Sequence, residues 1–251
     1  MDEVKNHVLS IAGFDPSGGA GVLADVKTFE ANKMQGMGII SALTFQNDRE
    51  FDRVQWIAVD EILQQYEVLN RRFKFSVVKI GLVENFEVLE AILAYLKAST
   101  SDCLFIWDPI LKASAGFEFH KNIDHHRIIK LLKNFSLITP NTDEIKLLTR
   151  IDNEMEAAKE LTNYCPVLLK GGHSKKEPGT DYLFMDDKIE QLKPYGIDAS
   201  PKHGSGCVLS SAITAQLAKG ENLLNSCLQA KKYTELFLSS NTTLLGTHNG
   251  K

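Results

Sequence analysis

The sequence is poor in the features that build disulfide-linked, metal-binding or nucleic-acid-binding proteins. It has four cysteines, Cys103, Cys165, Cys207 and Cys227, which are widely spaced and form no Cys-x-x-Cys pair. This pattern argues against a disulfide framework and against a cysteine metal site, and it fits a reducing cytoplasm. The net charge is −4 and no run is rich in lysine and arginine. Nucleic acid is therefore not an expected partner.

Long apolar stretches and targeting segments are also missing. No apolar run is long enough to span a membrane, and the first six residues lead into a strand-like segment without the features of a signal peptide. There is no internal repeat, low-complexity stretch or linker. The 43% of hydrophobic and 24% of charged residues are typical of a globular protein. We therefore expect one cytoplasmic domain over residues 1–251, without membrane contact.

The sequence does contain a regular alternation of strand-like and helix-like segments. The expected strands are 7–13, 36–46, 77–81, 103–109, 137–140, 166–171, 182–185 and 189–192. The expected helices are 21–33, 60–73 with Asp60 as N-cap, 85–97, 125–135, 143–149, 154–164, 207–219 and 223–239. Such alternation predicts an α/β fold with a mostly parallel central sheet and helices on both faces. Ligands of such folds bind beyond the carboxyl ends of the strands, where the polar motifs below fall.

The turn after the first expected strand is rich in glycine. Gly19, Gly21 and Ala24 have the spacing of a dinucleotide-binding fingerprint, so an NAD-dependent oxidoreductase is one alternative. The match is weak because Gln46 and Asn47 precede any acidic residue at the end of the second strand. A Walker-type P-loop is excluded here because no Gly-Lys-Ser/Thr follows. The glycines are better suited to letting the backbone approach a flat ligand.

Four polar side chains near this edge have two interpretations each. Asp15 and Asp25 are suited to binding a hydroxyl or amino group, or are a turn residue and a solvated helix residue. Gln46 offers a paired donor and acceptor that suit a heterocycle, or it satisfies loop backbone. Asp108, before Pro109, is suited to holding a water of hydrated Mg²⁺, or it caps the proline turn.

A second group of candidates would serve a nucleotide. Asn141 and Glu144 stand in the first turn of an expected helix, where Mg²⁺ and phosphates would be near, although the helix dipole alone favours acids there. Lys170 ends a buried strand before Gly171 and Gly172. Its ammonium group would neutralise phosphate, or it is an ordinary strand-end lysine.

The run from His203 to Cys207 is the most informative motif. Gly204, Ser205 and Gly206 form a glycine-rich turn that opens a helix, and such a turn presents free N–H groups to an anion. A helix N-terminus also lowers the pKa of a thiol from about 8.5, by a unit or more. The motif predicts phosphoryl transfer, with a merely buried cysteine at a helix start as the alternative.

In their order, these motifs resemble the hydroxymethylpyrimidine and phosphomethylpyrimidine kinases of thiamin biosynthesis, a branch of the ribokinase-like superfamily. Residues 12–21 read Ala-Gly-Phe-Asp-Pro-Ser-Gly-Gly-Ala-Gly and resemble that family's Ala-Gly-(Ser/Thr/Phe)-Asp-Pro-Ser-Gly-Gly-Ala-Gly signature. Between about residues 8 and 215, further resemblances follow in the same order at 24–29, 42–47, 79–82, 108–109, 137–141, 170–173 and 203–207.

The resemblance implies a ribokinase-like fold, ATP and Mg²⁺ as cofactors, and a homodimer. The implied substrate is 4-amino-5-hydroxymethyl-2-methylpyrimidine and then its monophosphate. The implied substrate contacts are Gln46, Asp25 near the hydroxymethyl group, Asp15, Gly13, Gly81 and Leu82. The implied nucleotide and metal contacts are Asn141, Lys170, Gly172 and His203, with Asp108 and Glu144 for Mg²⁺. Backbone N–H groups from Gly204 to Cys207 would hold the γ-phosphoryl group, and Cys207 would accept the hydroxymethyl proton.

Some residues depart from the family pattern. Phe45 replaces an alanine, Leu82 replaces a methionine, and Lys112 is displaced by two positions from the expected Lys-Ser-Gly. Such changes keep open a pyridoxal or pyridoxine kinase of the same fold. A catalytically silent pyrimidine-binding protein is a further alternative. The loops 113–124 and 173–180 are expected as mobile flaps.

Overall fold

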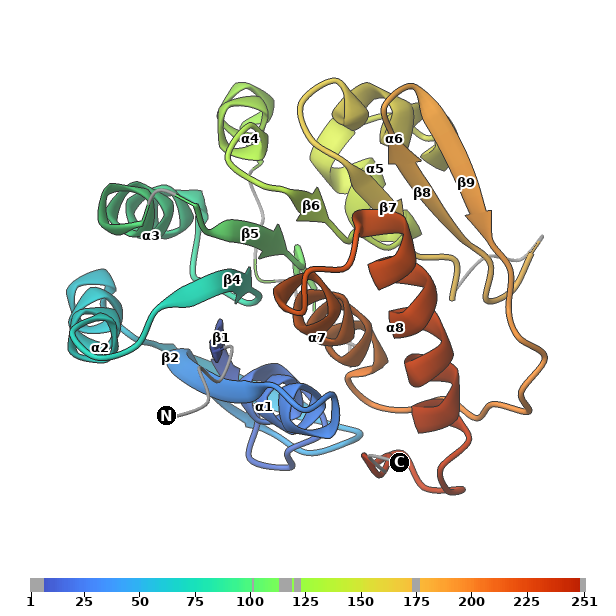
Figure 1. Ribbon diagram of the computed structural model, residues 1–251, viewed down its shortest axis with the longest axis horizontal. Helices are drawn as coiled ribbons and strands as arrows, with labels where there is room; N and C mark the ends of the chain where they lie inside the picture. The colour runs from blue at the N-terminus through green and yellow to red at the C-terminus, as the bar shows by residue number, and fades with distance from the viewer. Residues whose placement is uncertain (1–6, 101, 113–118, 120–122, 173–176, 249–251) are drawn as a thin grey trace.

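The described residues of the computed structural model, 7–100, 102–112, 119, 123–172 and 177–248, form one nine-stranded sheet (Figure 1). The strands are β1 His7–Phe14, β2 Gln35–Gln46, β3 Phe51–Trp56, β4 Phe75–Ile80, β5 Leu104–Trp107, β6 Leu137–Ile138, β7 Val167–Leu169, β8 Asp181–Met185 and β9 Lys188–Leu192. The helices are α1 Gly21–Ala31, α2 Val59–Asn70, α3 Phe86–Ser99, α4 His125–Leu132, α5 Thr142–Thr149, α6 Glu154–Thr162, α7 Ser205–Ala218 and α8 Leu223–Leu238.

The sheet order is β3-β2-β1-β4-β5-β6-β7-β8-β9. The six strands from β2 to β7 in this order pair in parallel, and β3, β8 and β9 add antiparallel edges. The predicted mostly parallel α/β sheet is therefore confirmed. The flap predictions fall largely outside the described residues, because 113–118, 120–122 and 173–176 are not described.

Two local predictions are wrong. The strand β3 was not expected, because half of its residues are polar. These side chains are exposed because β3 lies at the edge of the sheet. It forms by pairing with β2, with Phe45 opposite Arg53. The N-cap of α2 is Ala58 rather than Asp60. Asp60 lies in the first helical turn, where an acid is favourable beside the helix dipole.

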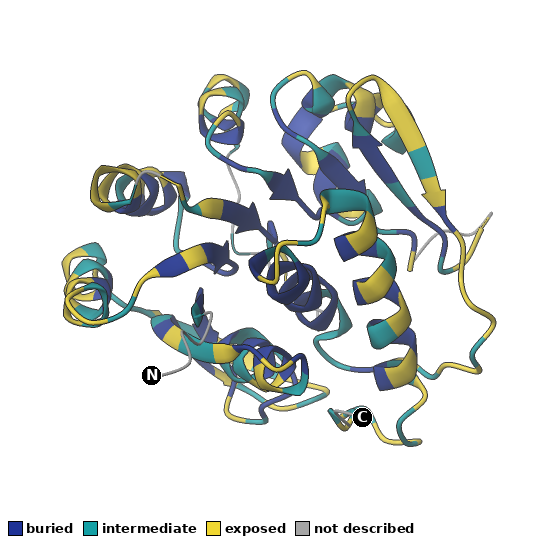
Figure 2. Ribbon diagram, in the orientation of Figure 1, coloured by how far each residue is buried: buried dark blue, intermediate teal, exposed yellow. Residues whose placement is uncertain are grey.

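Helices cover both faces of the sheet, as the alternation predicts. One apolar cluster joins the strands to α2, α3, α4, α5 and α6, and a second joins them to α1, α7 and α8. The alternation of side chains along each strand makes this division: Val77 belongs to the second cluster and Val78 to the first. Figure 2 shows that α7 is dark blue along almost its whole length, because it packs on the sheet and is flanked by α1 and α8.

The topology places a crevice at the middle of the sheet. β1 and β4 are neighbours, but α1, which follows β1, packs on one face, and α3, which follows β4, packs on the other. Chains that leave adjacent parallel strands toward opposite faces open a crevice at the carboxyl ends, where α/β proteins bind ligands. The helix α7 contacts β1, β4 and β5 and begins beside this crevice. No helix in the described part of the chain is long and apolar enough to cross a membrane.

Candidate active site

The turn between β1 and α1 is organised by one buried carboxylate. Asp15 is 1% exposed and accepts hydrogen bonds from the Ser17 and Ala20 backbone N–H groups, each at 2.9 Å. His203 Nε2 lies 2.8 Å from Asp15 Oδ2 and so ties this turn to the start of α7. Burial alone would raise the pKa of Asp15, but the hydrogen bonds from His203 and Ser17 lower it below its ordinary value. Asp15 therefore has the contacts of a turn residue, and its binding of substrate stays a prediction.

The first turn of α7 depends on a glycine. Gly204 is the N-cap residue with a φ of 74°, in the left-handed region that side chains disfavour. A Cβ atom at this position would lie 2.0 Å from the Gly19 carbonyl oxygen. No side chain caps this helix. The Ser205 N–H donates to the Lys202 carbonyl at 3.4 Å, so the first turn presents the Gly206 and Cys207 N–H groups and the positive end of the helix dipole to the crevice, as an anion site requires.

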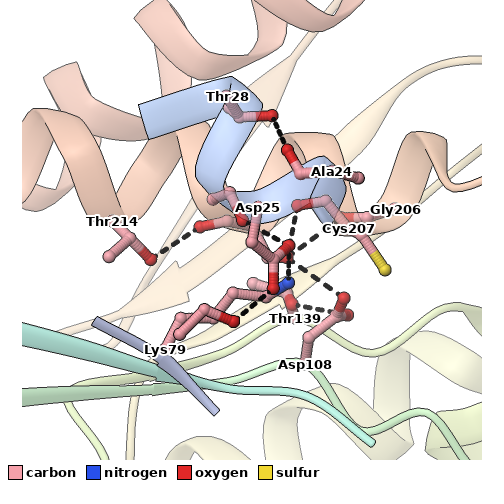
Figure 3. Close-up of polar contacts among 12 residues, drawn as sticks. Ala24, Asp25, Thr28, Lys79, Asp108, Thr139, Gly206, Cys207 and Thr214 are labelled. Carbon is pink, nitrogen blue, oxygen red and sulfur yellow. Dashed lines mark hydrogen bonds and ion pairs between the residues drawn. The ribbon is translucent and has the colours of Figure 1, made fainter. Parts of the chain in front are cut away.

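Two acid–lysine pairs lie near this turn, Asp25 with Lys79 (Figure 3) and Asp108 with Lys170. Asp25 of α1 and Lys79 of β4 are each 0% exposed at the side chain, and their charged atoms are 2.5 Å apart. Asp25 also accepts hydrogen bonds from Ser10 Oγ at 2.5 Å and Ser211 Oγ at 2.7 Å. Its two oxygens thus have three internal partners. The interpretation of Asp25 as a solvated helix residue is therefore wrong, whereas its contact with a substrate hydroxyl stays a prediction.

The second pair joins Asp108 and Lys170. Asp108, after β5, is 1% exposed and lies 2.8 Å from Lys170 Nζ, while Thr139 and Ser210 donate hydrogen bonds to its two oxygens at 3.0 Å. Burial would raise the pKa of Asp108, but Lys170 holds it below its ordinary value. Asp108 thus has protein partners on both oxygens. These contacts go beyond the alternative role of capping the proline turn.

Glu144 brings a further negative charge to the same lysine. Its Oε2 lies 3.7 Å from Lys170 Nζ and accepts a hydrogen bond from the Asn141 N–H at 2.7 Å. The Asn141 side chain in turn caps α5 by accepting from the Glu144 N–H at 2.8 Å. Burial raises the pKa of Glu144 to about 7, although Lys170 lowers it. Two carboxylates around one lysine leave this corner short of positive charge.

Cys207 occupies the first turn of α7, but the pKa of its thiol is raised rather than lowered as its position predicts. The residue is 6% exposed. Burial raises the pKa of its thiol to about 12, although Lys79 acts to lower it. The expectation of a thiol acidified by the helix N-terminus is therefore wrong, because loss of hydration outweighs the helix dipole and the nearby lysine.

The other side of the crevice is an open cavity of about 580 Å³. Its lining consists of Phe14, Pro16, Leu43, Thr44, Phe45, Gln46, Asn47, Glu50 and Asp52. Gln46 Nε2 donates to Thr44 Oγ1 at 2.8 Å, which orients the amide at the cavity wall. The Arg53 guanidinium lies 3.5 Å from the centre of the Phe45 ring. A cavity with largely apolar walls and the amides of Gln46 and Asn47 suits a flat heterocycle.

The remaining predicted residues lie around the same edge with different exposure. Gly13 and Gly81 end β1 and β4, and the Gly81 N–H donates to the Ile11 carbonyl at 2.9 Å. Leu82 is buried and its carbonyl accepts from Ser41 Oγ. Gly172 is exposed, at the edge of the described residues. The predicted candidates therefore gather at the carboxyl edge of the sheet, although Asp15 and Asp25 have internal partners.

Lys79, Ser210 and Ser211 were missed as functional candidates. A signal was present: Lys79 interrupts the apolar run of β4, and a lysine in a buried strand requires a carboxylate partner. The two serines lie in a helix that is buried on all sides, and nothing in their local sequence marks them.

Among the described residues, no three His, Cys, Asp or Glu side chains form a cluster able to hold a metal ion. Mg²⁺ bound with a nucleotide needs few protein carboxylates, because phosphates and water supply most of its ligands. The unbalanced negative charge of Asp108 and Glu144 around Lys170 fits such a sparsely held ion.

Comparison with known proteins settles the family. Residues 15–251 match the family described as phosphomethylpyrimidine kinase. The chain belongs to this family. A Rhizobium meliloti protein named hydroxymethylpyrimidine/phosphomethylpyrimidine kinase is 34% identical over 241 residues, which cover 92% of this chain and 90% of the relative. The resemblance drawn from the sequence motifs is therefore confirmed.

Solved structures agree with the phosphomethylpyrimidine kinase assignment. The crystal structure of phosphomethylpyrimidine kinase from Clostridium difficile has a TM-score of 0.78 and 32% identity, and the match covers 92% of this chain and 98% of that one. The pyridoxal kinase from Staphylococcus aureus in complex with AMP-PCP and pyridoxal has a TM-score of 0.81 and 25% identity, covering 94% and 88%. The ribokinase-like fold is thus confirmed.

Proposed function

We propose that this chain is an ATP- and Mg²⁺-dependent kinase that phosphorylates 4-amino-5-hydroxymethyl-2-methylpyrimidine and then its monophosphate. The observation that carries the proposal is the meeting of an uncapped helix N-terminus, Lys170 and an amide-bearing cavity at one edge of the sheet. Family membership and the names of the relatives give the substrate class. The four free thiols fit a reducing cytoplasm.

Backbone groups supply the main stabilisation of the transferred phosphoryl group in this proposal. The N–H groups from Gly204 to Cys207 would donate hydrogen bonds to the anion at the positive end of the α7 dipole, and Lys170 would add a positive charge. Phosphoryl transfer depends mainly on alignment and charge stabilisation, because little covalent chemistry falls to the protein. Asn141 and His203 would support the nucleotide side through the α5 cap and the link to Asp15.

Asp108 and Glu144 would hold Mg²⁺ together with the nucleotide phosphates. A bound Mg²⁺ would neutralise charge that develops on the phosphoryl oxygens. Lys170 Nζ lies near both carboxylates and orients them.

Cys207 contributes its backbone and its position rather than a thiolate. With a pKa near 12 the thiol is protonated at neutral pH, and an efficient general base titrates near the working pH. Gln46 would contact the pyrimidine from the cavity wall, and the backbone at Gly13 and Gly81 would lie beside it.

The test is turnover of hydroxymethylpyrimidine with ATP and Mg²⁺, with the phosphates added per pyrimidine counted by mass spectrometry. We expect the monophosphate first and the diphosphate after it. Gln46→Leu is expected to raise the pyrimidine KM by about 10-fold or more, with kcat changed less. Absence of ADP formation by the folded wild-type protein would refute the proposal, and an unchanged KM in Gln46→Leu would remove this residue from the site.

A pyridoxal kinase is the second candidate, favoured by the Staphylococcus aureus pyridoxal kinase structure. Kinetics on both substrates under the same conditions separate the two. We expect the larger kcat/KM with the pyrimidine, because the Rhizobium meliloti relative and the Clostridium difficile structure, both more than 30% identical, carry the pyrimidine kinase name. A larger value with pyridoxal would exchange the two assignments.

A further inference from the structure

Lys79 is a fully buried charge that the proposed phosphoryl transfer does not use. It lies on β4 between Val78 and Ile80, and its side chain is 0% exposed. Moving an ammonium and a carboxylate from water into a protein interior is expensive, and well-packed apolar residues often give equal stability. The Lys79–Asp25 pair therefore calls for an explanation other than stability.

The contacts of Asp25 connect this pair to the helix that opens the active site. Asp25 Oδ1 accepts a hydrogen bond from the Lys79 ammonium (Figure 3) and one from the Ser211 hydroxyl, and Oδ2 accepts one from the Ser10 hydroxyl. Four elements, β1, β4, α1 and α7, thus meet at one carboxylate. Ser211 lies four residues, or about one helical turn, beyond Cys207.

The neighbouring serine makes the equivalent contact on the other side. Ser210 Oγ lies 3.0 Å from Asp108 Oδ2, whose partner is Lys170, and it shares its proton with the Gly206 and Cys207 carbonyls of its own helix at 3.0 and 3.1 Å. Two adjacent residues of α7 are therefore held by two different acid–lysine pairs. Hydrogen bonds to charged groups are stronger than those between neutral groups and are directional, so each fixes both the height and the rotation of the helix.

We propose that Lys79 is a positioning residue for phosphoryl transfer. Through Asp25 and Ser211 it fixes α7 against β4, and so it fixes the backbone N–H groups of Gly206 and Cys207 relative to the strand ends that hold the acceptor. The proposal rests on the proposed kinase function. Misplacement of a catalytic group by about 1 Å costs up to roughly 100-fold in rate, so small movements of this helix matter.

The first test removes the link and leaves both charges in place. Ser211→Ala deletes one buried hydroxyl, and we expect kcat to fall about 10-fold while the KM for the pyrimidine stays within about twofold. Ser211→Thr restores the hydroxyl and is expected to recover most of the rate. The matched control is Thr214→Val, because Thr214 is equally buried in α7 and donates only to the Ser210 carbonyl of its own helix.

The second test removes the charges. Lys79→Met alone leaves a buried, unpaired carboxylate, so it is combined with Asp25→Asn to keep the interior neutral. We expect the double variant to fold and to show the same loss of kcat as Ser211→Ala. The proposal is overturned if the folded double variant has wild-type kcat, or if Ser211→Ala behaves like Thr214→Val.

A readout without turnover separates this proposal from the kinase function. Alkylation of Cys207 by iodoacetamide, followed at the peptide level by mass spectrometry, reports the seating of the first turn of α7. Its rate is expected to rise about fivefold or more in Ser211→Ala, with fully buried Cys227 as an unchanged internal reference. An inactive wild type would refute the kinase function alone, whereas equal Cys207 rates in all variants would refute the positioning role.

Discussion

Gly204 is the residue on which the geometry of the phosphate site depends most directly. Its positive φ turns the chain into α7, and its missing Cβ lets the Gly19 carbonyl approach. The side chains around it are buried and paired: Asp15 with His203 on one side, and Asp25 with Lys79 below. At this scale the site is a fixed arrangement of backbone groups supported by charges that water does not reach.

Gly204→Ala is expected to abolish measurable turnover, because the added Cβ would lie 2.0 Å from the Gly19 oxygen and displace the turn. The left-handed conformation alone costs an alanine about 1–2 kcal/mol of stability. Gly220→Ala is the control, since Gly220 has a φ of +89° but no atom within 4 Å of an added Cβ. It should lose similar conformational energy and keep its kcat. Steady-state kinetics and urea unfolding measure both effects, and an active Gly204→Ala would contradict this account.

Cys207→Ala tests whether the thiol acts as a base. The hydroxyl acceptor of the first step has a proton to lose, whereas the phosphate acceptor of the second step is already an anion. With a thiol pKa of about 12, we expect both steps to slow by the same factor, within about threefold. Separate kinetics on the two acceptors measure the ratio. A loss confined to the alcohol step would restore the base role that the sequence predicts.

The secondary structure elements were predicted better than their roles. Most strands and helices begin within about two residues of the predicted positions, because the spacing of apolar residues is a local signal. The edge strand β3 was missed because pairing with β2, and not its own sequence, makes it a strand. Asn141 has two roles that can be tested separately: it caps α5, and in the proposed function it supports the nucleotide site.

Asn141→Ala removes the cap of α5 and is expected to cost about 1 kcal/mol of stability. It also frees the first turn that carries Glu144, so the KM for ATP should rise. Asn153→Ala is the matched control, because Asn153 caps α6 through the same two N–H positions. It should lose similar stability and keep the wild-type KM. Equal KM values for the two variants would separate Asn141 from the nucleotide site.

The segment after α8 closes over the site turn and contains a titrating residue. The His203 N–H donates to the Leu244 carbonyl at 2.8 Å, and His248 packs on Phe237 with ring centres 4.7 Å apart. His248 Nδ1 also lies 2.9 Å from the Tyr233 hydroxyl. Burial lowers the pKa of His248 to about 4, with Lys27 acting in the same direction.

Because the folded-state pKa of His248 lies below its ordinary value of 6.5, the stability from its neutral form is present above pH 6.5 and is lost as pH falls toward about 4. Chemical unfolding between these pH values should show this loss. His248→Phe keeps an aromatic ring and should flatten the dependence, whereas His126→Gln, at an exposed position, should leave it unchanged. An unaltered slope in His248→Phe would contradict the prediction.

At the scale of the whole molecule, buried neutral thiols make the fold sensitive to alkali. Burial raises the pKa of Cys103, Cys165 and Cys207 to about 12 from an ordinary 9.0, and it raises that of Cys227 as well. The unfolded chain ionises first as pH rises. The stability contributed by the neutral thiols is therefore complete below about pH 9 and is lost progressively toward pH 12.

Guanidinium unfolding under reducing conditions, at a series of pH values from 8 upward, measures this effect. We expect the free energy of unfolding to fall with pH above about 9. Cys165→Ala should be less stable at pH 8, since it leaves a small cavity, but its slope above pH 9 should be shallower. A slope equal to that of the wild type would mean that Cys165 ionises alike in the folded and unfolded chain.

The sequence by itself determined the α/β fold, the order of the motifs and the edge at which they meet. Alternating strand and helix patterns are local, and a parallel sheet brings the ends of its strands to one side. The family was also readable from the signature at residues 12–21. Only the tertiary structure decided what Asp25 and Cys207 do there. Their burial and charge state depend on partners such as Lys79, 54 residues from Asp25, and Ser211, 186 residues away, because hydration is lost only when distant elements pack together.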